Sequence, residues 1–331
     1  MTIAATVERH RSTGLNREPR LIAPVSMADA VMGGRLVVHL EPHDRTHGAD
    51  EAVGDGRRMI MRIDRWAARL SRHSDTSDLS ALNADPRARV GVRPTLAAAL
   101  LAGLVAADAS EGFTDITLLD SRLTAEGIEG PRGGAAPSRI GDWRLISGRR
   151  GSATIERPPG LRFDLGGVGK GWLADRALRL LGDWPNAMVD ADGDLAFSCG
   201  PGKYWEIGVD DPRETDSQLA VLRFRVRVGE PPARWGVATS GTSIHRWTVD
   251  GVTSHHLIDP RTGLPASTDI VQATVVDSSA LRAEALAKAA VIAGRDASLA
   301  ILDRAHVRGA VLLTTSGEVL ALPATLPLLA A

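Results

Sequence analysis

Apolar residues recur at helical spacing in several segments of the chain. Between residues 57 and 70, apolar side chains return every three or four positions, with Arg and Asp between them, which is typical of an amphipathic helix. Elsewhere, Pro in a first turn and Gly just past a last turn mark helix ends. These patterns predict helices over residues 57–70, 96–109, 172–181, 281–293 and 296–303.

Shorter apolar runs between these helices predict β-strands. Two other segments, 41–56 and 121–142, are rich in Gly and charged residues, and we expect irregular surface structure there. Because strands and helices alternate without a regular parallel repeat, the pattern predicts an α+β or mixed α/β protein. The predicted strands are 35–40, 161–164, 187–189, 205–209, 220–228, 236–238 and 272–276.

The chain begins with a polar, Arg-rich segment that has no periodicity. We expect residues 1–28 to be a flexible arm and residues 29–331 to be the folded part. The start has no apolar region typical of a secretion signal, and the longest apolar stretch, residues 96–107, is too short to cross a bilayer. These features predict a cytoplasmic protein that is not an integral membrane protein.

Composition narrows the class of protein further. Hydrophobic residues make up 44% of the 331 positions and charged residues 24%, which is ordinary for a globular chain. The 39 Lys and Arg nearly balance the 40 Asp and Glu, so no overall positive charge favours nucleic acid as a partner. The single cysteine, Cys199, cannot form an internal disulfide and is predicted to be a buried, unreactive thiol. The histidines show no zinc-ligand spacing.

The segment DLGGVGKG, residues 164–171, is the strongest candidate for a binding site. Glycines let a ligand approach the backbone, and a helix N-terminus presents free N–H groups to an anion. Lys170 would add a positive charge suited to phosphate. A Walker A loop would need Ser or Thr at Gly171, and a dinucleotide fingerprint would need Gly at Trp172. The alternative is a glycine-rich turn that begins a helix, with Lys170 in solvent.

Two weaker clusters also contain candidate side chains. His255 and His256 precede an Asp-Pro-x-x-Gly turn, and neighbours on a strand point to opposite faces. One histidine facing a cleft, as a hydrogen-bond partner or base, is therefore favoured over a shared metal ion. Thr239 and Ser240 follow a short strand and could bind phosphate oxygens or belong to an ordinary turn.

Two further groups of charged residues have simple structural interpretations. The carboxylates of residues 190–194 predict an Asp-rich turn, because the glycine is misplaced for a calcium loop. Glu284 and Lys288 lie four residues apart on a predicted helix. On their own they predict an exposed salt bridge that stabilises the helix by about 0.3–0.5 kcal/mol.

As an ordered set, these segments resemble the ApbE family of flavin transferases. The resemblance runs from about residue 32 to residue 293, and DLGGVGKGWLAD is its most specific motif. The matching segments are Met32-Gly33, Ser71-Arg72 with 77–83 (SDLSALN), 112–117 (GFTDIT), 164–175 (DLGGVGKGWLAD), 205–209 (WEIGV), 239–241 (TSG) and 256–263 (HLIDPRTG).

The resemblance implies an α+β fold with two lobes of mixed or antiparallel sheet, helices outside and the nucleotide between the lobes. We place the break between the lobes near residue 150. The implied activity is Mg²⁺-dependent transfer of FMN from FAD to a Thr or Ser hydroxyl of an acceptor flavoprotein, with release of AMP. FAD would be the substrate, and Mg²⁺ and phosphate-binding groups would neutralise the charge of its diphosphate.

The resemblance also implies roles for individual residues. His256 would lie near the reacting phosphate or the isoalloxazine ring and would be catalytic together with Lys170. The carbonyl of Gly167 and the positions of Glu284 and Lys288 would belong to the metal site. The residues implied to line the flavin nucleotide site are Met32, Phe113, Thr114, Asp115, Asp164, Lys170, Thr239, Ser240 and Ile258.

The chain departs from the family at the implied metal ligands. Asp-x-x-x-Thr is usual in the late helix, where this chain has Glu284 and Lys288. An ammonium cannot ligate a metal ion, so Lys288 either pairs with Glu284 or supplies the charge in place of the metal. Residues 190–193 also differ from the usual Asn-x-Gly-Gly. Two alternatives therefore stay open beside the transferase, namely an FAD-binding protein without transfer and an FAD hydrolase that forms FMN and AMP.

Overall fold

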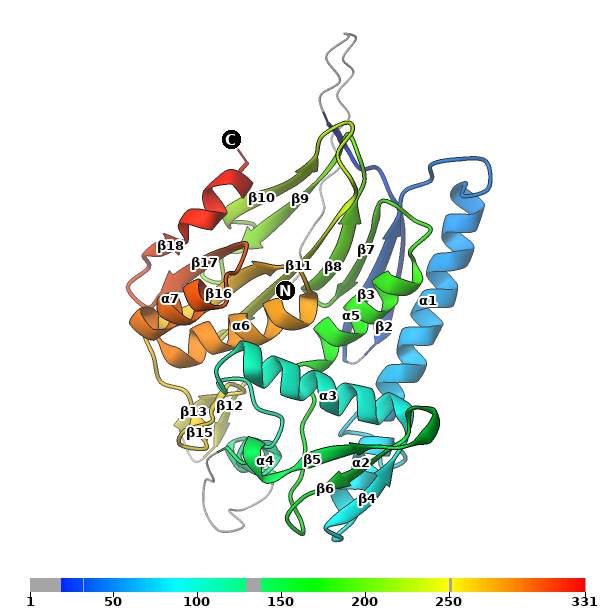
Figure 1. Cartoon of the computed structure of the whole chain (residues 1–331). Helices are drawn as coiled ribbons and strands as arrows, with labels where there is room; N and C mark the ends of the chain where they lie inside the picture. Colours follow the sequence, from blue (N-terminus) through cyan, green and yellow to red (C-terminus); the bar gives the residue numbers. More distant parts are fainter. Residues whose placement is uncertain (1–18, 32, 129–137, 250–251, 331) are drawn as a thin grey trace.

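The computed structural model describes residues 19–31, 33–128, 138–249 and 252–330. Its centre is a sheet of eight strands in which every neighbouring pair is antiparallel (Figure 1). From one edge to the other, the strands are β18 (Val319–Ala321), β17 (Gly309–Thr314), β16 (Ile270–Asp277), β11 (Ala233–Gly241), β8 (Asp194–Cys199), β7 (Ala187–Ala191), β3 (Gly34–Leu40) and β2 (Val25–Val31).

The eight-stranded sheet is covered on both faces. Along β7, Ala187 and Val189 belong to the core under the helices, whereas Met188 belongs to the core under a second, smaller sheet. This alternation follows from the period of two in a strand. The helices on one face are α1 (Ala49–Leu70), α5 (Gly169–Leu180) and α6 (Ala280–Ala293), followed by α7 (Arg295–Arg304), and the small sheet is formed by β1 (Arg20–Leu21), β9 (Lys203–Asp210) and β10 (Gln218–Val226).

A second part of the molecule lies at one end of this large sheet, below it in Figure 1. Helix α3 (Pro94–Ala109) separates the two parts and packs against α5 and α6. The other elements of this end are α2 (Asp78–Ala84), α4 (Leu119–Ala125), the sheet β4 (Arg89–Val92), β6 (Ala153–Glu156) and β5 (Arg144–Ser147), and the hairpins β12 (Arg246–Val249) with β13 (Val252–His255) and β14 (Ile258–Asp259) with β15 (Leu264–Pro265). Short 3₁₀ helices span Ile140–Asp142, Arg149–Gly151 and Pro323–Leu328.

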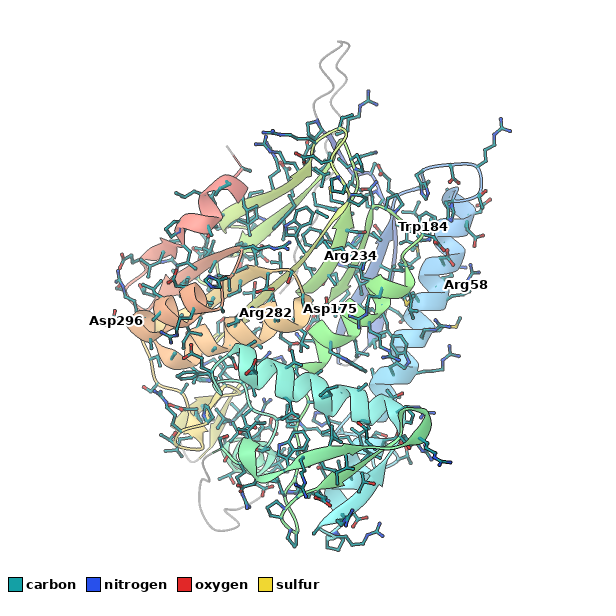
Figure 2. The ribbon with its side chains drawn as sticks, in the orientation of Figure 1. Arg58, Asp175, Trp184, Arg234, Arg282 and Asp296 are labelled. Carbon is teal, nitrogen blue, oxygen red and sulfur yellow. The ribbon has the colours of Figure 1, made fainter. Side chains whose placement is uncertain are left out.

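Asp175 holds the start of α6 against α5 (Figure 2). Its carboxylate accepts hydrogen bonds from the hydroxyl of Ser279 at 2.6 Å and from the N–H groups of Ala280 and Leu281 at 3.0 Å. These N–H groups have no partner within a helix, and a carboxylate at this end also interacts favourably with the helix dipole. The contact sets the position of α6, which carries Glu284 and Lys288.

The α+β class predicted from the sequence is confirmed, but the two parts do not separate at residue 150. The large sheet takes β2 and β3 from before that position and its other strands from after it. Residues 20–21 and 25–28, which we expected in a flexible arm, lie in β1 and β2. Residues 1–18 lie outside the described part of the chain.

Three predicted elements differ from the structure. Helix α1 begins at Ala49, inside the segment expected to be a surface turn, because Ala52 and Gly56 are buried there. Residues 161–164 form no strand, since the backbone of Phe163 is bonded on both its N–H and C=O to the side chain of Asn83, each at 2.8 Å. The segment 121–142, expected to be irregular, contains most of α4 and the short helix Ile140–Asp142, while 129–137 are not described.

The single cysteine and the lengths of the helices also bear on predictions from the sequence. Cys199 is fully buried, so the prediction of a buried thiol is confirmed. Burial raises the pKa of the thiol to about 12, which favours the protonated form that does not act as a nucleophile. Of the helices that the structure describes, none has both the length and the apolar character needed to cross a bilayer.

Candidate functional site

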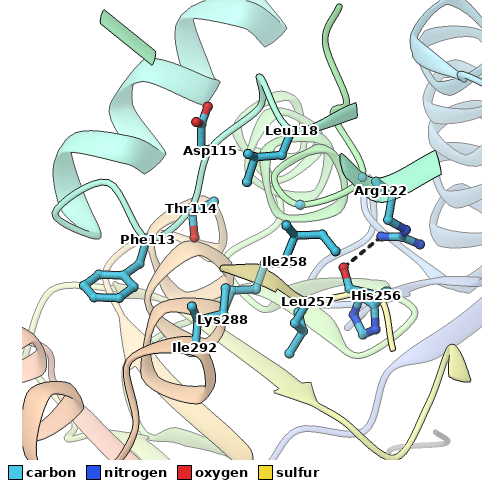
Figure 3. A pocket seen from close by; sticks show the side chains of 12 residues that line it. Phe113, Thr114, Asp115, Leu118, Arg122, His256, Leu257, Ile258, Lys288 and Ile292 are labelled. Carbon is cyan, nitrogen blue, oxygen red and sulfur yellow. Dashed lines mark hydrogen bonds between the residues drawn. The ribbon is translucent and has the colours of Figure 1, made fainter. Parts of the chain in front are cut away.

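A pocket lies where the two parts of the molecule meet (Figure 3). Its volume is about 470 Å³ when the open, solvent-filled mouth is included. Three segments far apart in the sequence form its walls: the chain after α3, the glycine turn before α5, and the chain that enters β14, together with side chains from α4 and α6. Its lining residues are Phe113, Thr114, Asp115, Leu118, Arg122, Gly166, Gly167, His256, Leu257, Ile258, Lys288 and Ile292.

The segment after α3 is fixed by its own side chains. Thr114 is buried and donates its hydroxyl to the carbonyl of Ala285 on α6 at 2.8 Å. The carboxylate of Asp115 accepts both the N–H and the hydroxyl of Thr117 at 2.8 Å, which is an Asx-type turn. The guanidinium of Arg261 lies over the ring of Phe113, 5.1 Å from its centre. Phe113, Thr114 and Asp115, which were expected to line the nucleotide site, thus form one wall of the pocket, and contacts within the protein hold them in place.

The glycine turn leads into α5, but its first helical turn is partly occupied by the protein itself. Asp164 accepts the N–H of Gly166 at 2.9 Å and shapes the turn. The N–H of Gly171, which would be free at a helix N-terminus, donates to the carboxylate of Glu284 at 2.9 Å. A protein carboxylate thus takes a place that the sequence suggested for a phosphate.

Glu284 and Lys288 form a buried ion pair, so the prediction of an exposed pair was wrong. The ammonium of Lys288 lies 2.8 Å from one oxygen of Glu284, whose side chain is 0% exposed. The Lys288 side chain is only 12% exposed and lines the pocket. A Cβ added to Gly167 would lie 3.6 Å from Cε of Lys288, so the glycine turn and this lysine are in contact across the pocket wall.

Lys170 does not line the pocket. Its ammonium lies 3.1 Å from the carboxylate of Asp194 and 3.4 Å from the carbonyl of Asp192. Burial raises the pKa of Asp194 to about 6, while the charge of Lys170 acts in the opposite direction. Glu284 and Lys288 also act on Asp194. Lys170, which is 30% exposed, and the more deeply buried Asp194, Glu284 and Lys288 therefore form one group, the charge cluster.

His256 is half-buried at the opposite wall. Its Nδ1 has no hydrogen-bond partner among the described residues, and the ring of His245 meets it edge to face with centroids 5.2 Å apart. Burial, followed by the charges of Arg122 and Lys288, lowers the pKa of His256 to about 2. The imidazole is therefore neutral. His255 is engaged elsewhere, because its Nε2 lies 2.9 Å from the carbonyl of Ala266.

Arg122 is the main pocket residue that the sequence did not indicate. It donates to the carbonyl of His256 at 3.2 Å (Figure 3) and pairs with Glu126, which also accepts from Arg72 at 2.7 Å. Arg72 in turn lies 4.0 Å from Asp164 at the glycine turn. The only local signal was the four-residue spacing of Arg122 and Glu126 within a segment expected to be irregular.

Other implied site residues lie elsewhere. Thr239 and Ser240 are part of strand β11 rather than a turn, and the hydroxyl of Thr239 lies 2.8 Å from that of Thr274. Met32 lies outside the described residues. Asp164 stands beside the pocket rather than in its lining. Leu118, Leu257 and Ile292, whose apolar side chains complete the pocket, were not singled out from the sequence.

The residues of the charge cluster do not suit Mg²⁺. Magnesium requires near-octahedral oxygen ligands, but position 288 presents an ammonium and each oxygen of Glu284 already accepts a hydrogen bond, one from Lys288 and one from Gly171. A divalent ion about 4 Å from the ammonium would be repelled by several kcal/mol at an effective dielectric constant of about 20. The ligand set implied by the resemblance is therefore not available in this arrangement.

His43, Asp44 and His47, before α1, also bring potential metal ligands together. The two imidazole rings are stacked, with centroids 4.7 Å apart and planes only 16° from parallel. Ring lone pairs lie in the ring plane, so rings in this arrangement do not converge on one ion. Asp44 instead accepts the N–H groups of Thr46 at 2.8 Å and His47 at 2.6 Å. We interpret this cluster as a hydrogen-bonded turn packed on Trp184.

Comparison with known proteins gives a family and a fold. The model of the ApbE family matches residues 32–312. A segment of the chain is 34% identical over 157 residues to the FAD:protein FMN transferase of Treponema pallidum, covering 43% of this chain and 41% of that protein. The corresponding protein of Escherichia coli K12 is 30% identical over 150 residues, covering 44% and 41%. The matched segments thus span about two fifths of these curated relatives.

Solved structures match over nearly the whole chain. The ApbE protein of Thermotoga maritima superimposes with a TM-score of 0.78 and 23% identity, covering 93% of this chain and all of that one. The flavin transferase ApbE of Vibrio cholerae gives a TM-score of 0.71 and 21% identity, covering 92% and 99%. At these identities the similarity establishes the shared α+β fold.

Proposed function

The chain belongs to the ApbE family, and from this membership we propose that it is an FAD:protein FMN transferase. It would transfer FMN from FAD to a Thr or Ser hydroxyl of an acceptor flavoprotein and release AMP. The observation that supports this proposal is the pocket itself. Three segments that carry the family's motifs, residues 112–117, 164–175 and 256–263, come from distant parts of the sequence and contribute to one hollow.

The proposed reaction is a phosphoryl transfer. The acceptor hydroxyl oxygen forms a bond to the phosphorus of the FMN half, and the bond from that phosphorus to the bridging oxygen breaks. AMP leaves with the bridging oxygen, and the hydroxyl proton passes to a base or to solvent. Catalysis of such a step depends mostly on positioning and on neutralising the charge of the phosphates.

We assign His256 the task of accepting a hydrogen bond from the attacking hydroxyl. Its Nδ1 is buried without a described partner, and its neutral imidazole can accept at that atom. The negative charge of a bound diphosphate would oppose the effect of Arg122 and Lys288 and raise the pKa of His256, which makes the ring a better base. Arg122 acts as a positioning residue through the His256 carbonyl.

Phe113, Thr114, Asp115 and Ile258 would contact the flavin nucleotide, as their places in the pocket wall support. Lys170 would act on the diphosphate only through the charge cluster, since Asp194 holds its ammonium away from the pocket. Thr239, Ser240 and Asp164 would support neighbouring structure. The resemblance implies that the reaction depends on Mg²⁺, but Glu284 and Lys288 give this expectation little support. We therefore assign no step to a metal ion. The cytoplasmic location stays a prediction.

The two alternatives use the same pocket. An FAD-binding protein without transfer is favoured specifically by Lys288, because it occupies the position of a family metal ligand. An FAD hydrolase differs only in that water replaces the acceptor hydroxyl. Product analysis separates the three functions because each leaves a different set of products.

The decisive experiment incubates the purified full chain with FAD and with protein extract from its own cells, freed of small molecules. We expect flavin fluorescence in a discrete protein band on a denaturing gel and an equal amount of AMP by chromatography. FMN and AMP without an acceptor would identify a hydrolase. Bound FAD without either product would identify a binding protein.

A further inference from the structure

We propose that the ammonium of Lys288 provides, from within the protein, the positive charge that the FAD diphosphate requires, so that FAD binds without a divalent cation. The inference rests on the proposed function, because it concerns the same pocket. It adds that Lys288 supplies the positive charge that Mg²⁺ would otherwise supply. FAD binding by this chain should therefore not depend on a metal ion.

Lys288 lies at the wall of the pocket that the glycine turn forms. Its side chain leaves α6 and lines the pocket beside Thr114 and the glycine turn, where a Cβ on Gly167 would be 3.6 Å from Lys288 Cε. The glycine turn is the part of the backbone that a diphosphate can approach most closely. The ammonium therefore lies close to the wall where negative charge would arrive.

Glu284 holds the ammonium of Lys288 in this place. One of its three N–H donors goes to Glu284 at 2.8 Å, and none of the other described residues takes the remaining two, which can bind a ligand. The fully buried Glu284 is itself fixed by the N–H of Gly171 at 2.9 Å, at the N-terminal end of α5. Lys288 is thus a pre-positioned cation rather than a mobile surface lysine.

Opposite charges are balanced within the charge cluster. When ionised, the charge cluster contains two ammonium groups, on Lys170 and Lys288, and two carboxylates, on Asp194 and Glu284. The carboxylate of Asp192 also lies 3.9 Å from the ammonium of Lys170, but its side chain is 38% exposed to solvent. The four groups of the charge cluster therefore compensate one another without a metal ion. Removing the ammonium of Lys288 would leave the buried Glu284 carboxylate with only a backbone N–H, and such an unpaired carboxylate attracts a cation. The same site should change from metal-independent to metal-dependent through one substitution.

The test measures FAD affinity of the full chain by flavin fluorescence, once with EDTA and once with excess Mg²⁺. The parent protein should bind FAD equally well in both, within about threefold. Lys288→Thr should lose at least about tenfold in affinity in EDTA and recover with Mg²⁺, and Lys288→Arg should resemble the parent. The matched control is Lys203→Thr, which removes another lysine that pairs with a buried glutamate at 2.6 Å, on β9 and away from the pocket.

A double variant tests the inference without leaving an unpaired buried charge that would destabilise the fold. Glu284→Gln with Lys288→Met removes both charges, so no buried charge is left unpaired. Its FAD affinity should fall at least about tenfold in EDTA, and Mg²⁺ should not restore it because the carboxylate is gone. Circular dichroism and thermal unfolding verify that each variant is folded.

Three results would overturn the inference. A parent protein that binds FAD only with Mg²⁺, and loses at least about tenfold in EDTA, refutes the role of Lys288 while the transferase proposal stands. A Lys288→Thr protein that binds FAD as tightly as the parent in EDTA refutes it as well. If the parent binds FAD in neither condition, the proposed function itself fails and the inference fails with it.

Discussion

His256 has a buried ring nitrogen without a partner among the described residues, and its replacement tests its proposed catalytic role. We expect His256→Asn to lower the rate of covalent flavin transfer by about tenfold to a hundredfold, since positioned proton acceptors contribute at least that much. FAD affinity should change by less than about threefold, because Asn leaves the carbonyl contact to Arg122 in place. Rates come from the gel assay and affinities from fluorescence titration. The control is the exposed His73→Asn, and an unchanged rate in His256→Asn would remove His256 from the mechanism.

We expect the free energy of unfolding to depend on pH through His39, which lies on β3. Burial, and then the charge of Arg35, lowers its pKa from 6.5 to about 4. Between pH 6.5 and 4 the unfolded chain therefore holds a proton that the folded chain does not. The free energy of unfolding should fall as the pH drops through this window, by at most about 1.4 kcal/mol per pH unit from this group, and its contribution is fully present above pH 6.5.

The measurement is urea unfolding of the parent and of His39→Gln at pH 7 and pH 5. Gln retains a hydrogen-bonding group for Ser26, whose hydroxyl lies 2.7 Å from the His39 ring. The loss of stability between the two pH values should be smaller in the variant than in the parent. Equal losses in the two proteins would show that His39 titrates normally in the folded state.

Single residues were predictable where their chemistry is local. The glycine motif identified the turn at Gly166 and Gly167. The paired histidines predicted that one of them faces a cleft, and the family resemblance implied His256, which lines the pocket. Arg122 could not be found in this way, because its contacts to His256 and Trp247 join residues more than a hundred positions apart. The burial of Glu284 was equally hidden, since i,i+4 spacing is the same on an exposed and on a buried helix face.

The crossing of α5 and α6 predicts a strict requirement for glycine at position 171. A Cβ there would lie 2.6 Å from the carbonyl oxygen of Ala280, a backbone atom that cannot turn aside. Gly171→Ala should therefore force the helices apart and lower the free energy of unfolding by at least about 2 kcal/mol. Gly169→Ala is the matched control, because a Cβ on this residue of the same helix meets nothing within 4 Å.

Chemical unfolding of the two variants checks this prediction. The control should match the parent within about 0.5 kcal/mol, since an alanine in the first helical turn is well tolerated. Gly171→Ala should also weaken FAD binding, because the N–H of Gly171 holds Glu284 in the charge cluster. If both variants are equally stable, the approach of α5 and α6 must be looser than the structure shows.

Among the helices, those that cover the large sheet were mostly predicted well from the sequence. The prediction was poorer where a helix contains glycines or lies in a segment with irregular backbone. The predicted helix 172–181 corresponds to α5 and 281–293 to α6, each with ends within a few residues. Helix α1 was predicted eight residues too short because Gly54 and Gly56 suggested a turn. Gly56 is needed there for packing, since a Cβ would lie 1.8 Å from the Met27 side chain.

At the scale of the whole molecule, the order of the strands could not be predicted from local patterns. Strand β3 pairs with β7 across about 150 residues of chain, and β8 pairs with β11 rather than with β9 in the large sheet. Such pairings depend on which apolar faces pack together, and the periodicity of apolar residues along the chain does not predict this. For the same reason the pocket, which lies between α3, α5 and β14, was predicted only through the resemblance of its motifs to a known family.

Because the pocket is formed by segments that are distant in the sequence, we expect a ligand to change hydrogen exchange in all of them. FAD, which joins a flavin and an adenosine through a diphosphate, should slow amide exchange in residues 113–118, 166–171 and 256–258 together. At a concentration of about 100 times Kd, it should raise the free energy of unfolding by about 2.7 kcal/mol. FMN or AMP alone should protect only some of these segments, because each carries half of the contacts.

Strands β9 and β10 provide the internal control, since they cover the opposite face of the large sheet from the helices. Their exchange should change no more than global stabilisation requires. Protection in a single segment would mean that the ligand occupies one wall without bridging the pocket, and no protection by FAD in any of them would place its binding site elsewhere. Because the three segments meet only in the folded molecule, their common response distinguishes a site built by the fold from binding to one exposed loop.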